Sequence, residues 1–278
     1  MEYFGISNKD PVNDPFIKDF NKFPFILEKD LLNTVIIEEK EMVLDNTNYH
    51  NCSVPILYEY RNNAALKVIW NGIKNGDIVT NRGAKRSLAA DKRNQKIERK
   101  VVNVNGDEKS IYLVTRGQKK KLSVAKFNSG FQAEKNVFKR SLNDYTIYGY
   151  AKTYNRDLQC FEHYTSEIDG FIKMDGNDNY APVEFKSMRS FRGATVNSFE
   201  RSWNIDAVIQ CRLAGINNVI IGYRNDNEMK LQRFYLDEFE SNVKNSVQCS
   251  LLRMNRNMKE LVRNKKVLDV HYPRGDKR

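Results

Sequence analysis

FEHYTSEIDGF (161–171) and YAPVEFKSM (180–188) are the two stretches around which this 278-residue chain is organised. Apolar, aromatic and β-branched residues dominate both, and Gly170 and the DGND stretch at 175–178 separate them. Such segments, bounded by turn-forming residues, are typical of β-strands. We therefore expect two strands here, close together in the sequence.

Acidic residues recur at alternate positions of these strands. Side chains two positions apart on a strand point to the same face, so Glu167 and Asp169 share one face and Glu184 and Lys186 share another. If the strands are neighbours, three carboxylates and one ammonium meet in one patch. Carboxylates at short range repel each other, and a divalent cation such as Mg²⁺ or Mn²⁺ relieves that repulsion. The lysine could orient a water or stabilise negative charge.

This arrangement, an aspartate followed by Glu-x-Lys on adjacent strands, is similar to that of the PD-(D/E)XK metal nucleases. Either motif taken singly is more typical of a solvent-exposed charged face. The rest of the chain has to decide between these interpretations.

The charge balance favours an anionic partner. Lys and Arg number 46 against 35 Asp and Glu, a net charge of +11, and nucleic acid is the usual partner of so basic a protein. We find no basic amphipathic helix beside a lipidation signal and no membrane-spanning apolar run, so no membrane partner is expected. The first 20 residues contain three aspartates and no apolar signal core. We expect an intracellular protein, in the nucleus, the cytoplasm or both, and not a secreted one.

The cysteines and histidines exclude several chemistries. No C-x-x-C pair occurs, so neither a zinc site nor a disulfide framework is expected at Cys52, Cys160, Cys211 and Cys249. The three histidines are scattered, which gives Ser-His-Asp or Cys-His catalysis little support. His163 is interpreted as a second-layer or surface residue.

Hydrophobic periodicity and turn residues predict the remaining elements. We expect helices over 55–74, 129–143, 200–214 and 237–264. We expect strands over 77–83 (leading into a turn), within 98–125, and over 145–154, 160–174, 180–188, 217–224 and 229–236. Asn105-Gly106 marks a hairpin, and Gly215 suits the position after a helix. The tail over 265–278 is expected to be loose.

These elements predict an α+β fold. We expect a single domain over 1–278, built around twisted mixed β-sheets with flanking helices, and an active site in a cleft between sheet and helix. The motif-bearing core spans about 77–236, and a C-terminal helix over 237–264 follows it.

Five segments in order resemble the DXO family of decapping nucleases, which act as RNA 5′-end pyrophosphohydrolases and decapping exoribonucleases. They are DIVTNRGAKR (77–86), GFQAE (130–134), Glu167-Ile168-Asp169, Glu184-Phe185-Lys186 and WNIDAVIQCRLAGINNVIIGYRNDNEMK (203–230). Asn81 replaces the tryptophan usual in the first segment, and the Thr-Pro that normally follows is missing. Substrate contacts there are therefore expected to differ.

The resemblance implies the site residues. Glu134, Asp169 and Glu184 would bind metal, with Glu167 reaching it directly or through water and the main-chain carbonyl of Phe185 as a further ligand. Two ions, Mg²⁺ or Mn²⁺, are implied. Lys186 would position the water, and Gln210 would hold Lys186 or the nucleophile. Without the resemblance, Gln210 is interpreted as a solvent-facing residue of a helix.

The resemblance also places Arg82 near the RNA 5′ end. Further basic residues are candidates for an RNA track, although most lysines in such runs are simply solvated. They are Lys85, Arg86, Lys119, Lys120, Lys121, Arg189 and Arg192. No RRM, KH or zinc-knuckle motif is visible, so we expect recognition of the 5′ end and backbone rather than of base sequence.

The implied function is a metal-dependent hydrolase acting on RNA with a modified 5′ end in RNA quality control. It would remove an incomplete, unmethylated or NAD-type cap or a 5′ pyrophosphate, and 5′–3′ degradation could follow. A 5′–3′ exoribonuclease is a candidate partner. The alternative is a catalytically weak relative that binds RNA or stabilises a partner. A DNA-cutting nuclease would leave the fifth segment unexplained, so no DNA substrate is expected.

Overall fold

The computed structural model describes residues 1–7, 9–36, 54–92, 94–104, 106–116, 133–134, 136–138, 145–176, 179–189, 199–225 and 228–271. Its chain forms two compact units. The first unit comprises Met1–His50, Lys119–Gly149 and Glu167–Val247, and the second comprises Asn51–Gln118, Tyr150–Ser166 and Gln248–Arg278. That the whole chain folds as one domain stays a prediction.

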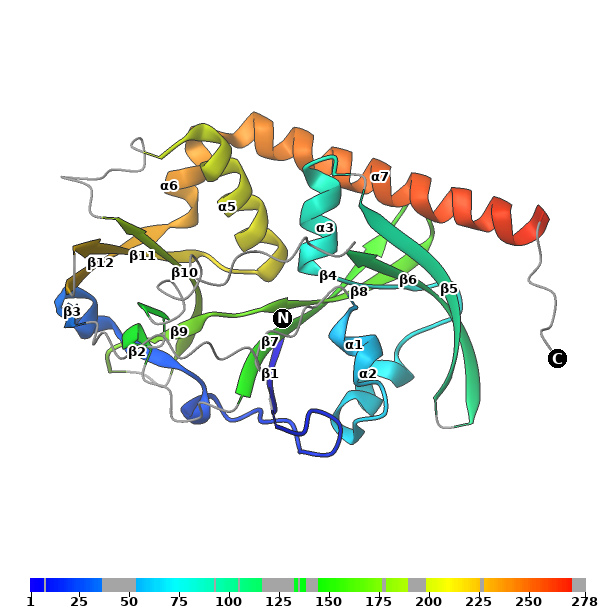
Figure 1. The fold of residues 1–278 in the computed structure, drawn as a ribbon, viewed down its shortest axis with the longest axis horizontal. Helices are drawn as coiled ribbons and strands as arrows, with labels where there is room; N and C mark the ends of the chain where they lie inside the picture. Colours follow the sequence, from blue (N-terminus) through cyan, green and yellow to red (C-terminus); the bar gives the residue numbers. More distant parts are fainter. Residues whose placement is uncertain are drawn as a thin grey trace. The chain divides into compact units, whose positions relative to one another are not determined.

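The elements of the first unit include all strands of one six-stranded sheet, two α-helices and two 3-10 helices (Figure 1). They are β1 (Glu2–Ser7), η1 (Phe20–Lys22), β2 (Phe25–Leu27), η2 (Glu28–Leu32), β3 (Thr34–Ile36), β9 (Gly170–Lys173), β10 (Tyr180–Arg189), α5 (Arg201–Ala214), β11 (Asn218–Asn225), β12 (Glu228–Tyr235) and α6 (Leu236–Ser241). The sheet has the order β2-β9-β10-β11-β12-β3. It is mixed, because β10 pairs with β11 in parallel and with β9 in antiparallel fashion.

One face of this sheet covers the apolar core of the first unit. The core cluster consists of Ile26, Leu31, Ala133, Val137, Phe138, Ile172, Val183, Phe185, Ile220 and Met229. Burying these side chains is the main favourable contribution to folding of this unit. Gly170 packs directly against the Phe138 ring, because an added Cβ there would lie 2.5 Å from a ring carbon.

The second unit contains the hairpin and the short helices. Its elements are α1 (Ile56–Glu59), η3 (Ala64–Leu66), α2 (Lys67–Asn71), β4 (Ile78–Asn81), α3 (Arg82–Ala89), β5 (Gln95–Val104) and β6 (Asp107–Arg116). β7 (Tyr145–Asn155), β8 (Cys160–Glu167) and α7 (Lys244–His271) have residues in both units. The other sheet has the order β1-β7-β8-β4-β6-β5, and it is also mixed. The α+β class with two mixed sheets and flanking helices is therefore confirmed.

Two antiparallel strand pairs join neighbouring segments of the chain, and the first is the predicted hairpin. β5 and β6 pair in antiparallel register up to Val104 and Asp107, and Gly106 between them has a φ of 91° that suits glycine. β11 and β12 pair in the same way. The helix predicted over 200–214 is α5, and Gly215 follows it with the left-handed φ of 63°. These elements carry strong local signals, which is why the sequence predicts them well.

Several boundaries differ from the expectation. The helix expected over 55–74 is broken, because the Asn63 side chain accepts from the N–H of Ala65 and starts a new turn. The turn expected after the 77–83 strand is instead the helix α3, capped by the Asn81 side chain, which accepts from the N–H of Ala84 at 2.8 Å.

The helix expected over 237–264 consists of α6 and α7, and α7 continues to His271, into the tail expected to be loose. The Ser241 hydroxyl donates to the carbonyl of Glu238, where it competes with the helix backbone close to the break. Of the helix expected over 129–143, only 133–134 and 136–138 lie within the described residues. The N–H of Phe138 donates to the carbonyl of Glu134, as in a helix.

The strand expected over 160–174 is divided between the two sheets. β8 ends at Glu167 and β9 begins at Gly170. The N–H of Ile168 still donates to the carbonyl of Ile147, whereas the N–H of Phe171 donates to Pro24 next to β2. The chain changes sheets between these two hydrogen bonds, at the position of Asp169.

Two further observations concern the helices and the cysteines. Among the described helices, none is both long and apolar enough to cross a membrane. The three described cysteines, Cys160, Cys211 and Cys249, are free thiols. Burial raises the pKa of the Cys160 thiol to about 11, with smaller contributions from nearby carboxylates, so this thiol is protonated at neutral pH.

Candidate active site

The strand adjacency on which the argument for the site depends is present next to Asp169. β9 and β10 are antiparallel, with Gly170 opposite Val183. Continuing this register by one residue places Asp169 beside Glu184. A carboxylate oxygen of Asp169 accepts from the N–H of Phe185 at 2.7 Å, which fixes the aspartate against β10. The Asp169 side chain therefore forms a hydrogen bond to the β10 backbone at the position just before β9 begins.

Glu184 is the buried acid of the site. It is 1% exposed, and an isolated ionised carboxylate at such a position would be very unfavourable. Lys186 Nζ and Gln210 Nε2 both donate to its Oε1 atom. These two donors compensate the buried charge. The side chain of Lys186 is 29% exposed, so its ammonium lies nearer to solvent.

The position of Gln210 follows from chain topology. Parallel strands need a crossover connection, and α5 is the helix between the parallel neighbours β10 and β11. Gln210 is 7% exposed and bonded to Glu184, so the solvent-facing interpretation of Gln210 was wrong. An expected sheet-to-helix contact is thus present between β10 and α5, both of the first unit.

The alternation along β10 is as expected. Phe185 belongs to the apolar core cluster, whereas Glu184 and Lys186 are joined on the opposite face. The corresponding argument for Glu167 and Asp169 was wrong in detail, because β8 ends at Glu167 and the two acids do not lie on one regular strand. Burial still alternates: Glu167 is exposed, Ile168 is buried, and Asp169 is half-buried.

Two further expected metal ligands, Glu134 and Glu167, belong to the same unit as Asp169 and Glu184. Glu134 is half-buried in a helical stretch of the first unit. Within the described residues, no group of three or more His, Cys, Asp or Glu side chains lies in an arrangement that could hold a metal ion. The structure brings together Asp169, Glu184, Lys186 and Gln210. The convergence of Glu134 and Glu167 with them stays a prediction.

The basic residues of the first resemblance segment lie in the second unit. Arg82 is the first residue of α3 and is half-buried. Lys85, expected as part of an RNA track, is instead 3% exposed, and its Nζ lies 2.5 Å from an oxygen of the buried Glu162. The same ammonium lies 4.3 Å from the centre of the Tyr164 ring. Lys85 therefore belongs to a buried ion pair and does not face a solvent-exposed substrate.

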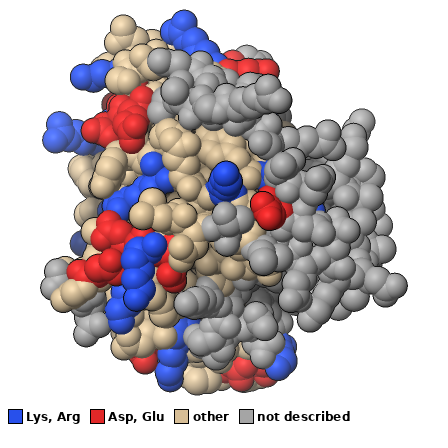
Figure 2. Space-filling model, turned by 90° about the vertical axis from the view of Figure 1, so that its left-hand side faces the viewer, with Lys and Arg blue, Asp and Glu red and all other residues tan. Residues whose placement is uncertain are grey.

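The remaining track candidates give little further information. Lys119, Lys120, Lys121, Arg192 and the side chain of Arg189 lie outside the described residues. Figure 2 shows one face of the molecule, on which basic and acidic side chains are interspersed.

A polar network around His163 was not anticipated. His163 is fully buried, its Nε2 lies 3.0 Å from Asp77 Oδ2, and its Nδ1 lies 2.7 Å from the Tyr150 hydroxyl. Since Asp77 is the acceptor, Nε2 carries the proton and Nδ1 accepts from Tyr150. Burial lowers the pKa of His163, although the hydrogen bond to Asp77 opposes this shift. Of the two alternatives given for His163, the surface residue was therefore wrong, and the second-layer residue stays a prediction.

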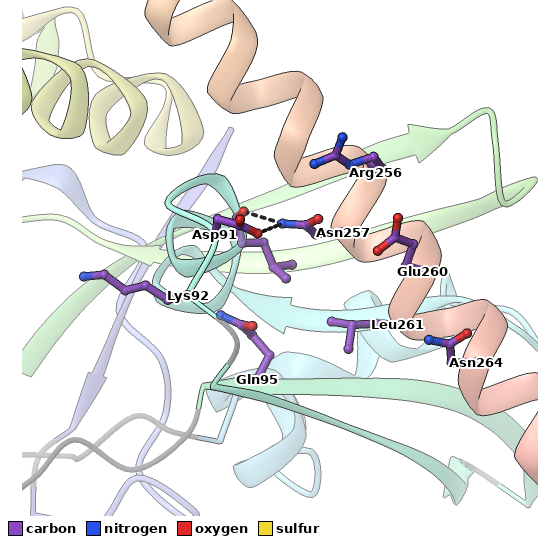
Figure 3. A pocket seen from close by; sticks show the side chains of 9 residues that line it. Asp91, Lys92, Gln95, Arg256, Asn257, Glu260, Leu261 and Asn264 are labelled. Carbon is purple, nitrogen blue, oxygen red and sulfur yellow. Dashed lines mark hydrogen bonds between the residues drawn. The ribbon is translucent and has the colours of Figure 1, made fainter.

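A pocket of about 440 Å³ lies within the second unit, between α7 and the segment that joins α3 to β5 (Figure 3). Asn257 donates to the carbonyl of Leu88 and to the carboxylate of Asp91, which ties α7 to the end of α3. The lining residues are Leu88, Asp91, Lys92, Gln95, Arg256, Asn257, Glu260, Leu261 and Asn264. None of them belongs to the predicted site.

The site and fold together define an α+β protein with a buried carboxylate, held by a lysine and a glutamine, on one face of a mixed sheet. No protein-family model and no curated protein sequence matches this chain. Solved structures do match it over nearly its full length, at low sequence identity.

Three of these structures illustrate the similarity. S. pombe Rai1 in complex with 3′-FADP has a TM-score of 0.59 and 16% identity, covering 96% of this chain and 85% of that one. K. lactis Dxo1 in complex with manganese has a TM-score of 0.59 and 14% identity, covering 97% and 82%. C. albicans Rai1 in complex with pU5-Mn²⁺ has a TM-score of 0.56 and 13% identity, covering 93% and 79%.

The chain therefore has the fold of the Rai1 and Dxo1 proteins, that is, the DXO fold. The resemblance that the motifs indicate is confirmed at the level of the fold.

Proposed function

We propose that this chain is a metal-dependent hydrolase of RNA 5′ ends. Its substrate would carry an incomplete, unmethylated or NAD-type cap or a 5′ pyrophosphate, and 5′–3′ degradation of the RNA body would be a second activity of the same site. The observation that carries this proposal is the buried Glu184, bonded to Lys186 and Gln210 and adjacent to Asp169. Complexes of the same fold with pU5-Mn²⁺ and 3′-FADP support a nucleotide substrate.

The donor set suits a hard divalent cation. The carboxylates of Asp169 and Glu184 and the main-chain carbonyl of Phe185 are oxygen ligands of the kind that Mg²⁺ and Mn²⁺ prefer. In the proposal, Glu134 and Glu167 complete the set for two ions. When bound, such cations generate a nucleophilic water at neutral pH and neutralise charge on the leaving oxygen.

The chain's own side chains have distinct tasks. The Lys186 ammonium, near solvent at the edge of the buried carboxylate, would orient the water and stabilise negative charge that develops on the phosphate. Gln210 would hold the Glu184 carboxylate in one orientation, and fixed donors of this kind cost no reorganisation during the reaction. Arg82 would bind the 5′ end, and a guanidinium suits this role because it forms paired hydrogen bonds with phosphate.

A product assay tests this function. The pure protein is incubated with 5′-triphosphate, capped, NAD-capped, 5′-hydroxyl and 5′-monophosphate RNAs, with Mg²⁺ or Mn²⁺, and a single-stranded DNA serves as a further arm. We expect release of the 5′ group from at least one RNA, and we expect Asp169→Ala to abolish it while RNA binding remains. Binding to RNA without any product would favour the alternative, a relative that binds RNA or stabilises a partner exoribonuclease.

A matched pair of variants separates the tasks within the site. Arg82→Ala is expected to raise the RNA concentration needed for half-maximal rate, because it removes a substrate contact and no carboxylate. Asp169→Ala is expected to lower the rate at saturating RNA, because the lost interaction matters mainly in the transition state. Equal effects of the two variants on both quantities would contradict this division.

A further inference from the structure

The hydroxyl of Tyr223, in β11, is a buried polar group to which none of the described residues provides a hydrogen-bond partner. Its oxygen is buried and has no hydrogen-bond partner within the part of the chain that the structure describes. A buried hydroxyl without a partner destabilises the folded state, because it has lost its hydrogen bonds to water. Burial also raises the pKa of Tyr223, so the phenol is neutral and remains a donor at physiological pH.

Strand alternation places Tyr223 on the face that carries the candidate site. An added Cβ at Gly222 would meet the Met229 and Phe185 side chains, so Gly222 faces the apolar core cluster. The next residue, Tyr223, therefore points to the opposite face. That is also the face opposite to Phe185 that carries Glu184.

The pairing register locates Tyr223 more closely. On β10 its partner is Met188, two positions beyond Lys186, and on β12 its partner is Lys230. Paired residues of adjacent strands point to the same side, so these side chains form one row across the sheet. Tyr223 thus lies on the strand next to β10, and its position is displaced from that of Lys186 by two residues along the strands.

The two rows of Glu184 and Tyr223 on this face differ in how far their side chains are buried. The row of Glu184 is closed, with Val219 and Phe234 as its other members, 0% and 3% exposed. The row of Tyr223 is less buried: Met188 and Tyr223 are half-buried, and Lys230 is exposed. Of these two rows, the Tyr223 row is therefore the more accessible to a ligand.

We propose that the Tyr223 hydroxyl and the Lys230 ammonium hold one backbone phosphate of the RNA next to the bond that is cleaved. The inference rests on the proposed function and extends it to a substrate contact outside the carboxylate set. A neutral donor beside a cation matches a phosphate oxygen, which accepts from both. Because the hydroxyl is covered in the structure, its cover has to shift when the phosphate arrives, and the cost of the unmade hydrogen bond is then relieved.

The test uses Tyr223→Phe, which deletes one oxygen, beside the control Tyr180→Phe. The Tyr180 hydroxyl already donates to Asn21 at 2.8 Å, within the same unit. Affinity for a fluorescent 5′-monophosphorylated RNA pentanucleotide is measured by anisotropy in EDTA, and thermal unfolding is followed in parallel. We expect Tyr223→Phe to weaken binding about tenfold or more without lowering Tm, because hydrogen bonds to charged groups are among the strongest. We expect Tyr180→Phe to leave binding unchanged.

Two further measurements test the shared phosphate. Lys230→Gln is expected to reduce the slope of log affinity against log salt by about 1, as for one lost phosphate contact. A methylphosphonate is then placed at each linkage in turn. At one linkage the methylphosphonate should abolish most of the difference in RNA affinity between wild type and Tyr223→Phe. At the same linkage it should also abolish the effect of Lys230→Gln on affinity.

The outcomes separate the two proposals. If wild-type protein binds RNA without releasing any product and Tyr223→Phe still weakens binding, the hydrolase proposal fails and the phosphate contact stands. If Tyr223→Phe binds like the wild type and unfolds at a higher temperature, the hydroxyl is only an uncompensated cost of the fold, and the inference is overturned. A wild-type protein that neither binds nor cleaves RNA would overturn both.

Discussion

Replacing Glu184 with glutamine tests the centre of the site, because it removes one charge and keeps the shape. Glu184 is 1% exposed and accepts from both Lys186 and Gln210. A glutamine can accept through its single amide oxygen, but its NH₂ group also turns a donor toward groups that are themselves donors. The perturbation is therefore electrostatic, and no cavity is created.

The cost to stability follows from the burial of the two partners. Removing one member of a buried ion pair typically costs about 3–5 kcal/mol. Here Lys186 is 29% exposed and can turn its ammonium to water, so we expect a smaller loss of about 1–3 kcal/mol. For a protein of this size that corresponds to a Tm lower by roughly 2–12 °C. The rate of RNA 5′-end hydrolysis is expected to fall about a hundredfold or more, as for the loss of other preorganised charged contacts.

The assay combines thermal unfolding, RNA binding in EDTA and single-turnover hydrolysis with Mn²⁺. Glu240→Gln is the matched control, because Glu240 also carries a carboxylate bound by a cation, Arg212, at the surface of the same unit. We expect this control to cost at most about 1 kcal/mol and to leave the rate unchanged. If Glu184→Gln hydrolyses RNA at the wild-type rate, our assignment of the site is refuted, whatever happens to Tm.

Three other predictions concern pH, packing and salt. Burial lowers the pKa of His163 despite the hydrogen bond to Asp77, so the folded state favours the neutral ring. The contribution of His163 to the free energy of unfolding is fully present above the unfolded pKa of about 6.5 and declines as pH falls below it. Urea midpoints should therefore drop from pH 7 to pH 5, and equal midpoints would contradict this. Gly170→Ala would place a Cβ 2.5 Å from the buried Phe138 ring and should cost about 1–3 kcal/mol in denaturant unfolding, whereas Gly72→Ala, whose nearest neighbour would be 3.4 Å away, should cost less. RNA affinity should fall steeply between 50 and 200 mM salt in anisotropy titrations, since Lys and Arg contacts to phosphate release counterions; a flat profile would exclude a phosphate-binding surface.

Local signals in the sequence were sufficient for much of the fold. The hairpin of β5 and β6 follows from Asn105-Gly106 between alternating strands, and the end of α5 follows from Gly215. From the sequence alone the adjacency of the two motif segments is a condition, and β9 and β10, which are close together in the sequence, do pair. In each case the deciding interaction joins residues close in the chain, so short-range patterns contain the information.

The Glu-x-Lys motif shows what a short pattern can determine about the site. The period of two fixes Glu184 and Lys186 on one face of β10 with Phe185 on the other, and the structure agrees. The same period failed at Glu167 and Asp169. No local sequence signal shows that the chain leaves one sheet there. The change is determined by backbone hydrogen bonds to two segments distant in the sequence, at Ile147 and Pro24.

Tertiary structure alone decided which polar side chains are buried and what they contact. Lys85 resembles any other lysine of a basic segment, yet it forms an ion pair with Glu162, which lies 77 residues further along the chain. Tyr223 resembles any strand tyrosine until the register places it beside Lys230 and the solvent-excluded position of its hydroxyl is known. The sequence by itself determined the residue types and the period of each strand. Burial and long-range pairing depend on how distant segments meet, so only the folded chain decides whether a charged or polar group is solvated, paired or left to a ligand.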